Sequence, residues 1–126
     1  MVIYLELLKA LYGMLQSALL FYRKLCQDLE GVRFTVNPYD LSVANKMVDG
    51  AQLMVVWHVD NMKISHVKKK CVNEMIEWSK SMYEDKVGKV KQSRRKVHDY
   101  LGMEMDFSQA GEVQIKMIKY VKDMVA

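Results

Sequence analysis

The sequence lacks the features of a secreted, disulfide-linked or membrane-spanning protein. Its two cysteines, Cys26 and Cys71, are too few for a disulfide framework or a four-ligand zinc site, so we expect two reduced thiols in an intracellular protein. No apolar run reaches the ~18 residues that a transmembrane helix needs. The N-terminus has neither the basic region nor the small-residue cleavage site of a signal peptide. We therefore expect no membrane contact and a location in the cytoplasm or the nucleus.

Proline and glycine are also scarce, at one and six of 126 residues, while 51% of the chain is hydrophobic and 27% is charged. This composition is typical of a globular protein and excludes a disordered or low-complexity chain. Neither a glycine-rich phosphate loop nor a G-x-S-x-G nucleophile motif occurs. The length predicts a single domain over residues 1–126.

Positive charge is concentrated in the middle of the chain. Residues 63–98 contain eleven basic and four acidic side chains, a balance of +7, whereas the net charge of the whole chain is only +4. A local excess of this size suits a polyanion such as nucleic acid. A solvated helix face followed by a charged loop would show the same excess.

The periodicity of apolar residues predicts an α+β domain. Helical spacing occurs over residues 17–30, with Ser17 as N-cap and Gly31 as stop, over 67–84, and from 118 to the end. Short apolar or alternating runs predict strands over residues 32–36, 42–48, 53–59, 62–65, 101–107 and 113–117. The run over residues 53–59 is nearly continuous, as in a strand buried on both faces. Hairpins mixed with helices, without βαβ units, indicate an antiparallel sheet with helices on one face.

The turn His58-Val59-Asp60-Asn61 is the clearest candidate for chemistry. A tight hairpin over residues 52–65 would hold the Asp60 carboxylate rigidly and leave it exposed, as a hard cation such as Mg²⁺ requires. An Asp-Asn pair is also common in hairpin turns that bind no metal. The histidines His58, His66 and His98 fit no zinc spacing, and we interpret them as structural or surface residues.

Five blocks of the sequence, in order, resemble the reverse transcriptases of copia-type LTR retrotransposons. Residues 9–17, followed by Phe21-Tyr22 and Leu25, are similar to the family segment KALYGLKQSPRxWYxKL. Residues 32–40 resemble GFxxSxYDxCLY, and residues 58–61 stand where the family has YVDD. Residues 101–105 resemble FLGIEI, and residues 115–121 resemble ISQxxYIxxLL.

The resemblance implies a partial polymerase palm that acts on a template–primer of RNA or DNA and on a dNTP. It implies that Gly13 and Gln16, at the start of the first helix, face the nucleotide and template. Asp60 would bind the catalytic Mg²⁺ or Mn²⁺, and Leu101-Gly102 would lie on a hairpin that supports the primer end. Lys68, Lys69 and Lys70 would contact the nucleic-acid backbone.

The sequence also departs from the family pattern. Asn61 stands in place of the second aspartate, and we expect the first catalytic aspartate, the fingers and the ribonuclease H region to be missing. A single anionic ligand would balance the repulsion between two divalent cations poorly, so we expect no catalysis by the isolated chain. Two alternatives stay open: a nucleic-acid-binding or protein-interaction module that uses residues 63–98, and a chain that associates with itself or with the missing polymerase parts.

Overall fold

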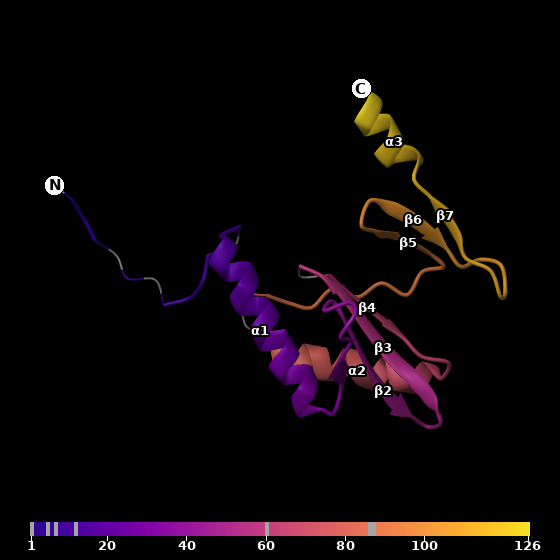
Figure 1. Cartoon of the computed structure of the whole chain (residues 1–126), viewed down its shortest axis with the longest axis horizontal. Coiled ribbons are helices and arrows are strands. Elements are labelled where there is room, and N and C mark those ends of the chain that lie inside the picture. Colours follow the sequence, from indigo (N-terminus) through magenta and orange to yellow (C-terminus); the bar gives the residue numbers. More distant parts are fainter. Residues whose placement is uncertain (1, 5, 7, 12, 60, 86–87) are drawn as a thin grey trace. The chain divides into compact units, whose positions relative to one another are not determined.

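The computed structural model describes residues 2–4, 6, 8–11, 13–59, 61–85 and 88–126. The described residues form three α-helices and seven β-strands, and every strand pair is antiparallel. The predicted α+β class is therefore confirmed. The chain divides into two compact units, Met1–Glu77 and Trp78–Ala126, and each carries one of the two sheets (Figure 1).

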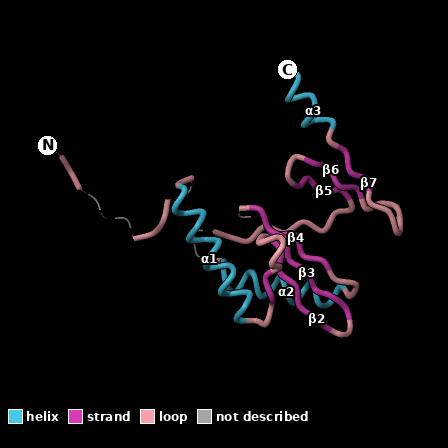
Figure 2. The backbone as a smooth tube through the Cα atoms, viewed as in Figure 1, coloured by secondary structure: helices cyan, strands magenta, loops and turns pink. Residues whose placement is uncertain are grey.

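The first unit contains one long helix, which is followed along the chain by a four-stranded sheet. Its strands lie in sequence order, β1-β2-β3-β4, each paired with the next (Figure 2). The elements are α1 (Leu15–Gly31), β1 (Thr35–Val36), β2 (Val43–Val48), β3 (Ala51–His58) and β4 (Asn61–Ser65), and they are followed by α2 (Lys69–Tyr83), which extends into the second unit.

The core of this unit lies on one face of the sheet. The register pairs Ala44 with Val55 and Lys46 with Leu53, so these residues share a face with Trp57. Ala44, Leu53, Val55 and Trp57 are all buried. The opposite face is half-buried or exposed along its length. The prediction that residues 53–59 are buried on both faces is therefore wrong, because only one side of β3 belongs to the core.

Helix α1 covers this buried face. Leu25 and Leu29 are fully buried, and the ring of Tyr22 lies 6.3 Å from that of Trp57, centroid to centroid. A side-chain hydrogen bond with Cys26, together with burial, raises the pKa of Tyr22 above its ordinary value. The apolar spacing that predicts this helix therefore marks the side that packs on the sheet.

The start of α1 differs from the prediction. The helix begins at Leu15, Met14 occupies the N-cap position, and no side chain caps the helix. Ser17 is not the N-cap: it lies inside the helix, and its hydroxyl donates a hydrogen bond back to the carbonyl of Leu11.

The end of α1 is a Schellman turn with an arginine in the left-handed position. Phe34 N–H donates to the Leu29 carbonyl, and Arg33 N–H donates to the Glu30 carbonyl. Arg33 has a φ of +69°, where glycine is the usual residue. The helix does end at Gly31, as predicted, but Gly31 does not supply the left-handed residue. Leu29 and Phe34 occupy the two positions where apolar residues usually accompany this cap, and both are buried.

Helix α2 starts with a histidine-supported turn. His66 Nδ1 accepts a hydrogen bond from the Lys68 N–H at 2.9 Å, and its Nε2 lies 3.0 Å from the Val48 carbonyl. These contacts fit a ring whose Nδ1 accepts and whose Nε2–H donates. Cys71 and Met75 are buried, whereas Val67, which the periodicity places on the same stripe, precedes the helix and is 82% exposed.

The second unit contains a three-stranded antiparallel sheet and a short helix. Its elements after α2 are β5 (Val97–Tyr100), β6 (Met103–Asp106), β7 (Gln114–Lys116) and α3 (Ile118–Val125). Strand β5 is not predicted from the sequence, and Leu101 lies in a turn rather than in a strand. The described residues between Tyr83 and Val97 form no helix or strand.

The second sheet has one apolar and one polar face. The register aligns His98, Met105 and Ile115 across the three strands, and places Glu104 beside Lys116 on the other face. The hydroxyl and N–H of Ser108, at the start of the β6–β7 loop, hold the pKa of Asp106 below its ordinary value. No described helix in the chain is long and apolar enough to cross a membrane.

Replacing Arg33 with glycine should stabilise the first unit. Glycine adopts a positive φ without the ~1 kcal/mol penalty of an L-residue, so Arg33→Gly should raise the free energy of unfolding by about 0.5–1 kcal/mol in urea titrations. Arg23 is an exposed residue inside α1, and Arg23→Gly should lower it by about 1 kcal/mol. Equal losses of unfolding free energy in Arg33→Gly and Arg23→Gly would contradict the left-handed conformation of Arg33.

Candidate functional site

The β3–β4 hairpin closes with a two-residue turn. His58 and Asn61 form the last cross-strand pair, so Val59 and Asp60 alone connect the strands. The predicted hairpin over residues 52–65 is therefore confirmed, whereas the prediction for Asp60 lies outside the described residues. Asn61 is the first residue of β4 rather than a turn residue.

Val59 has an unusual backbone conformation. Its φ is +56°, and its side chain is 51% exposed. A β-branched residue rarely adopts a positive φ, and such a residue costs about 1–3 kcal/mol. Hairpin turns of two residues require a positive φ at their first central position, so the short connection between the strands imposes this conformation on Val59.

Helix α1 runs antiparallel to β3. Beyond the C-terminal end of α1, the Val32 carbonyl accepts a hydrogen bond from Lys46 Nζ at 3.1 Å, and Lys46 pairs with Leu53 near the start of β3. Nearer the start of α1, Tyr22 contacts Trp57 near the end of β3. The N-terminus of α1 and the β3–β4 turn are therefore at the same end of the first unit.

Gly13 and Gln16 lie at this end. Gln16 is exposed in the first turn of α1, about 9 Å along the helix axis from Tyr22. Gly13 has a φ of +87°, which allows the chain to turn sharply into the helix. No acidic residue occupies the first turn of α1, and no side chain caps it, so its backbone N–H groups and the positive end of its dipole face outward.

The described residues of the turn do not fit a pair of divalent cations. His58, Val59 and Asn61 are exposed, and none carries a negative charge in its ordinary state. Among all described residues, no three His, Cys, Asp or Glu side chains are grouped so that they could hold a metal ion. The expected ligand, Asp60, is not among them. We therefore derive no catalytic step through a metal at this turn.

Leu101 and Gly102 form the two-residue turn between β5 and β6 in the second unit. Their φ values are +53° and +75°, as a type I′ hairpin turn requires. A Cβ on Gly102 would lie 3.6 Å from the ring of Tyr120 in α3. These residues do lie on a hairpin, as expected, and both are exposed.

Lys68, Lys69 and Lys70 are exposed at the start of α2. Lys68 Nζ lies 3.3 Å from Asp49 Oδ2, and Lys70 Nζ lies 3.8 Å from Glu74 Oε1. Exposed pairs of this kind contribute about 0–1 kcal/mol, so they leave the lysines accessible to another anion. Lysines at a helix N-terminus also repel the positive end of the dipole. A bound anion would relieve this repulsion.

The three histidines are in separate places. His66 supports the start of α2, His58 ends β3, and His98 stacks edge-on against Phe107 at 6.1 Å, centroid to centroid. His66 and His98 therefore have the structural contacts that the sequence interpretation assigns to them.

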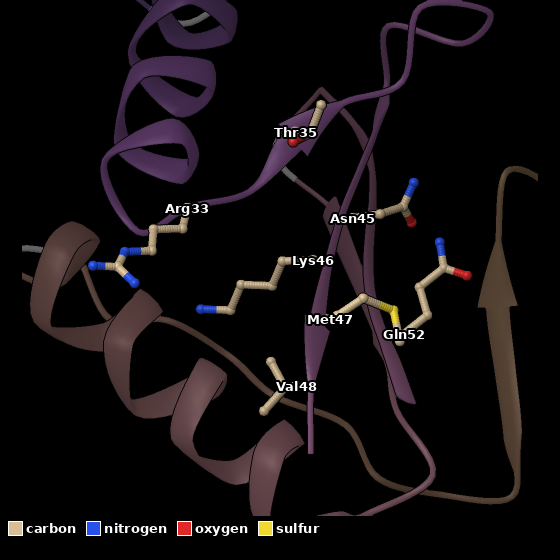
Figure 3. Close-up of a pocket in the computed structure, with 7 residues that line it drawn as sticks. All are labelled: Arg33, Thr35, Asn45, Lys46, Met47, Val48 and Gln52. Atoms are coloured by element: carbon tan, nitrogen blue, oxygen red, sulfur yellow. The ribbon is translucent and has the colours of Figure 1, made fainter. Parts of the chain in front are cut away.

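A pocket of about 640 Å³ opens beside β2. Arg33 and Thr35 line it from the segment after α1, residues 45–48 line it from β2, and Gln52 lines it from β3 (Figure 3). Sequence reasoning misses this pocket, since neither the spacing nor the composition of these residues signals it. Its two cations, Arg33 and Lys46, are far apart in the sequence and line the same pocket because the segment after α1 runs beside β2.

Comparison of the chain with protein-family models, with curated proteins and with solved structures finds no match. In the first unit, the start of α1 and the β3–β4 turn are at one end. Lys68–Lys70 follow β4, and the Leu101-Gly102 turn belongs to the second unit.

Relieving the conformation of Val59 should stabilise the hairpin. Asparagine tolerates a positive φ much better than valine, so Val59→Asn should raise the free energy of unfolding by about 1 kcal/mol in urea titrations. The same substitution at Val56, a half-buried position in the middle of β3, should lower it because asparagine is unfavourable in strands. A loss of stability in Val59→Asn would argue against the positive φ.

Proposed function

We propose that the chain is part of a copia-type reverse-transcriptase palm, in which the β3–β4 hairpin and the start of α1 face a template–primer and a nucleotide. One observation carries the proposal. The Tyr22–Trp57 contact and the Lys46–Val32 hydrogen bond align α1 with β3, so the predicted nucleotide-facing residues and the predicted metal-binding turn are at the same end of one unit.

The physical properties of this end suit a triphosphate. The N-terminus of α1 has no side-chain cap and no acidic residue in its first turn, and the positive end of a helix dipole attracts phosphate. Nucleotidyl transfer depends mainly on positioning and on electrostatic stabilisation. The strand that leads into the β3–β4 turn is anchored in the core by the buried Trp57.

A divalent cation would supply electrostatic stabilisation of the reacting phosphate group. Asp60 would be one ligand, whereas Asn61 offers only a neutral amide oxygen. We therefore propose that the chain supplies part of the site and is inactive alone. Among the described strands, β4 pairs only with β3, so we propose that its other edge pairs with a strand from another part of the polymerase. Such a strand would lie beside Asn61 and would bring a further carboxylate to the turn.

The isolated chain should not extend a primer. We expect no product on a primed RNA or DNA template with Mg²⁺ or Mn²⁺, and we expect none from Asn61→Asp, because one restored carboxylate still leaves the ligand set incomplete. The measurement is product length on a denaturing gel, with an active reverse transcriptase as positive control. Primer extension that disappears in Asp60→Ala would contradict the inactive-fragment proposal.

A second candidate function is nucleic-acid binding without catalysis, through residues 63–98. The observation that favours it is the exposed group Lys68, Lys69 and Lys70, with only weak ion pairs to Asp49 and Glu74. The described residues between Tyr83 and Val97 have no regular structure, and five basic residues there, Lys89, Lys91, Arg94, Arg95 and Lys96, could follow a phosphate backbone.

Neutralising the lysine group should weaken nucleic-acid binding and its salt dependence together. For a single-stranded oligonucleotide, each phosphate contact contributes about 0.7 to the slope of log K against log salt. The triple variant Lys68→Gln, Lys69→Gln, Lys70→Gln should therefore lower the slope by about 2 in fluorescence-anisotropy titrations. The control variant Lys116→Gln, Lys119→Gln, Lys122→Gln carries the same charge change and should have a smaller effect. Equal effects would indicate attraction by net charge alone.

A further inference from the structure

The pocket beside β2 is open because β1 is short. Strand β1 pairs only with Ala44 and Asn45, so among the described strands nothing continues along the outer edge of β2 from Lys46 to Val48. The segment before β1 carries Arg33 past this edge. The resulting pocket, at about 640 Å³, is within the range of small-ligand sites, about 300–1,000 Å³.

Two basic side chains, Arg33 and Lys46, extend on the same side of β2 (Figure 3). Figure 3 shows the side chains of Arg33 and Lys46 reaching toward the space between α2 and the strand, while Asn45 and Gln52 extend from the other face. No acidic residue lines the pocket. The positive charge inside it is therefore not neutralised by its own walls.

Lys46 is held in place without a carboxylate. Its ammonium donates to the Val32 carbonyl at 3.1 Å and lies 4.9 Å from the centroid of the Phe34 ring. An ammonium has three donors, so one bond to a carbonyl leaves capacity for an anion. These two contacts orient the charge and keep the half-buried side chain from folding out to solvent.

Arg33 occupies a position where a smaller residue would be more stable. Its φ of +69° belongs to the left-handed region, and glycine would complete the same Schellman turn without strain. The guanidinium is exposed and lines the pocket. Strain at a pocket residue points to a role other than stability.

We propose that this pocket binds a phosphate group, held by the Arg33 guanidinium and the Lys46 ammonium. The guanidinium fork matches two phosphate oxygens, and the ammonium contributes a second positive charge. Thr35 and Asn45 share the opposite face of the strands (Figure 3), so the site consists of these two cations alone. The phosphate belongs either to a small molecule or to a nucleic acid. This proposal does not depend on the polymerase assignment, because every residue that it uses lies away from the β3–β4 turn.

Phosphate binding can be measured on the full chain at low ionic strength, with inorganic phosphate and pyrophosphate as probes, by calorimetry and by ³¹P line broadening. We expect binding by the natural chain and at least an approximately tenfold weaker affinity in Arg33→Gln, the loss typical of a charge-assisted hydrogen-bond pair. Arg23→Gln is the matched control, since it removes the same charge from an exposed site on α1, and it should bind as the natural chain does.

The variant Arg33→Gly distinguishes an effect on phosphate binding from an effect on the stability of the fold. It should bind phosphate as weakly as Arg33→Gln while being more stable than the natural chain, so that the two properties move in opposite directions.

A 12-nucleotide single-stranded oligonucleotide then distinguishes the two sources of the phosphate group, a small molecule and a nucleic acid. If Arg33→Gln lowers the affinity for phosphate but not for the oligonucleotide, the ligand is a small phosphate compound. If it lowers both affinities, the ligand is a nucleic-acid backbone. No phosphate binding by the natural chain, or equal losses in Arg33→Gln and Arg23→Gln, overturns the proposal.

Discussion

The packing of α1 on the buried face of β3 is the constraint on which the first unit depends. Tyr22 contacts Trp57, and the fully buried Leu25 and Leu29 belong to the same side of the helix. Burial of these side chains fixes the direction of α1 relative to the sheet. Because the direction is fixed, the uncapped start of the helix and the β3–β4 turn are at one end, whereas the Schellman cap and the cationic pocket are at the other.

Much of this unit could be predicted from the sequence, because its signals are local. The spacing of Tyr22, Leu25 and Leu29 predicts the packed face of α1, and Asp49-Gly50 predicts the turn between β2 and β3, where both residues have a positive φ. The near-continuous apolar run of β3 predicts a strand correctly. It does not predict the burial of each face, since that depends on which side the helices cover.

The features that sequence reasoning missed are produced by tertiary packing. Serine is a common N-cap residue, but α1 begins before Ser17, and the Ser17 hydroxyl donates a hydrogen bond to the Leu11 carbonyl. Strand β5 contains His98 and Asp99 and carries no apolar run, so only its pairing with β6 defines it. The Arg33–Lys46 pocket joins residues from separate elements. Their proximity depends on the length of β1 and on an unusual φ, neither of which any pattern of residue types specifies.

The two-residue connection between β3 and β4 has a consequence for how this chain tolerates insertions. Side chains alternate between the faces of a strand, so one residue added to or removed from this connection would invert β4 relative to β3. Met62 and Ile64, which share a face with Trp57 and Val55, would then point away from the core, and Lys63 would point into it. Length variation in a homologous chain at this position should therefore occur in steps of two residues, or be accompanied by a bulge.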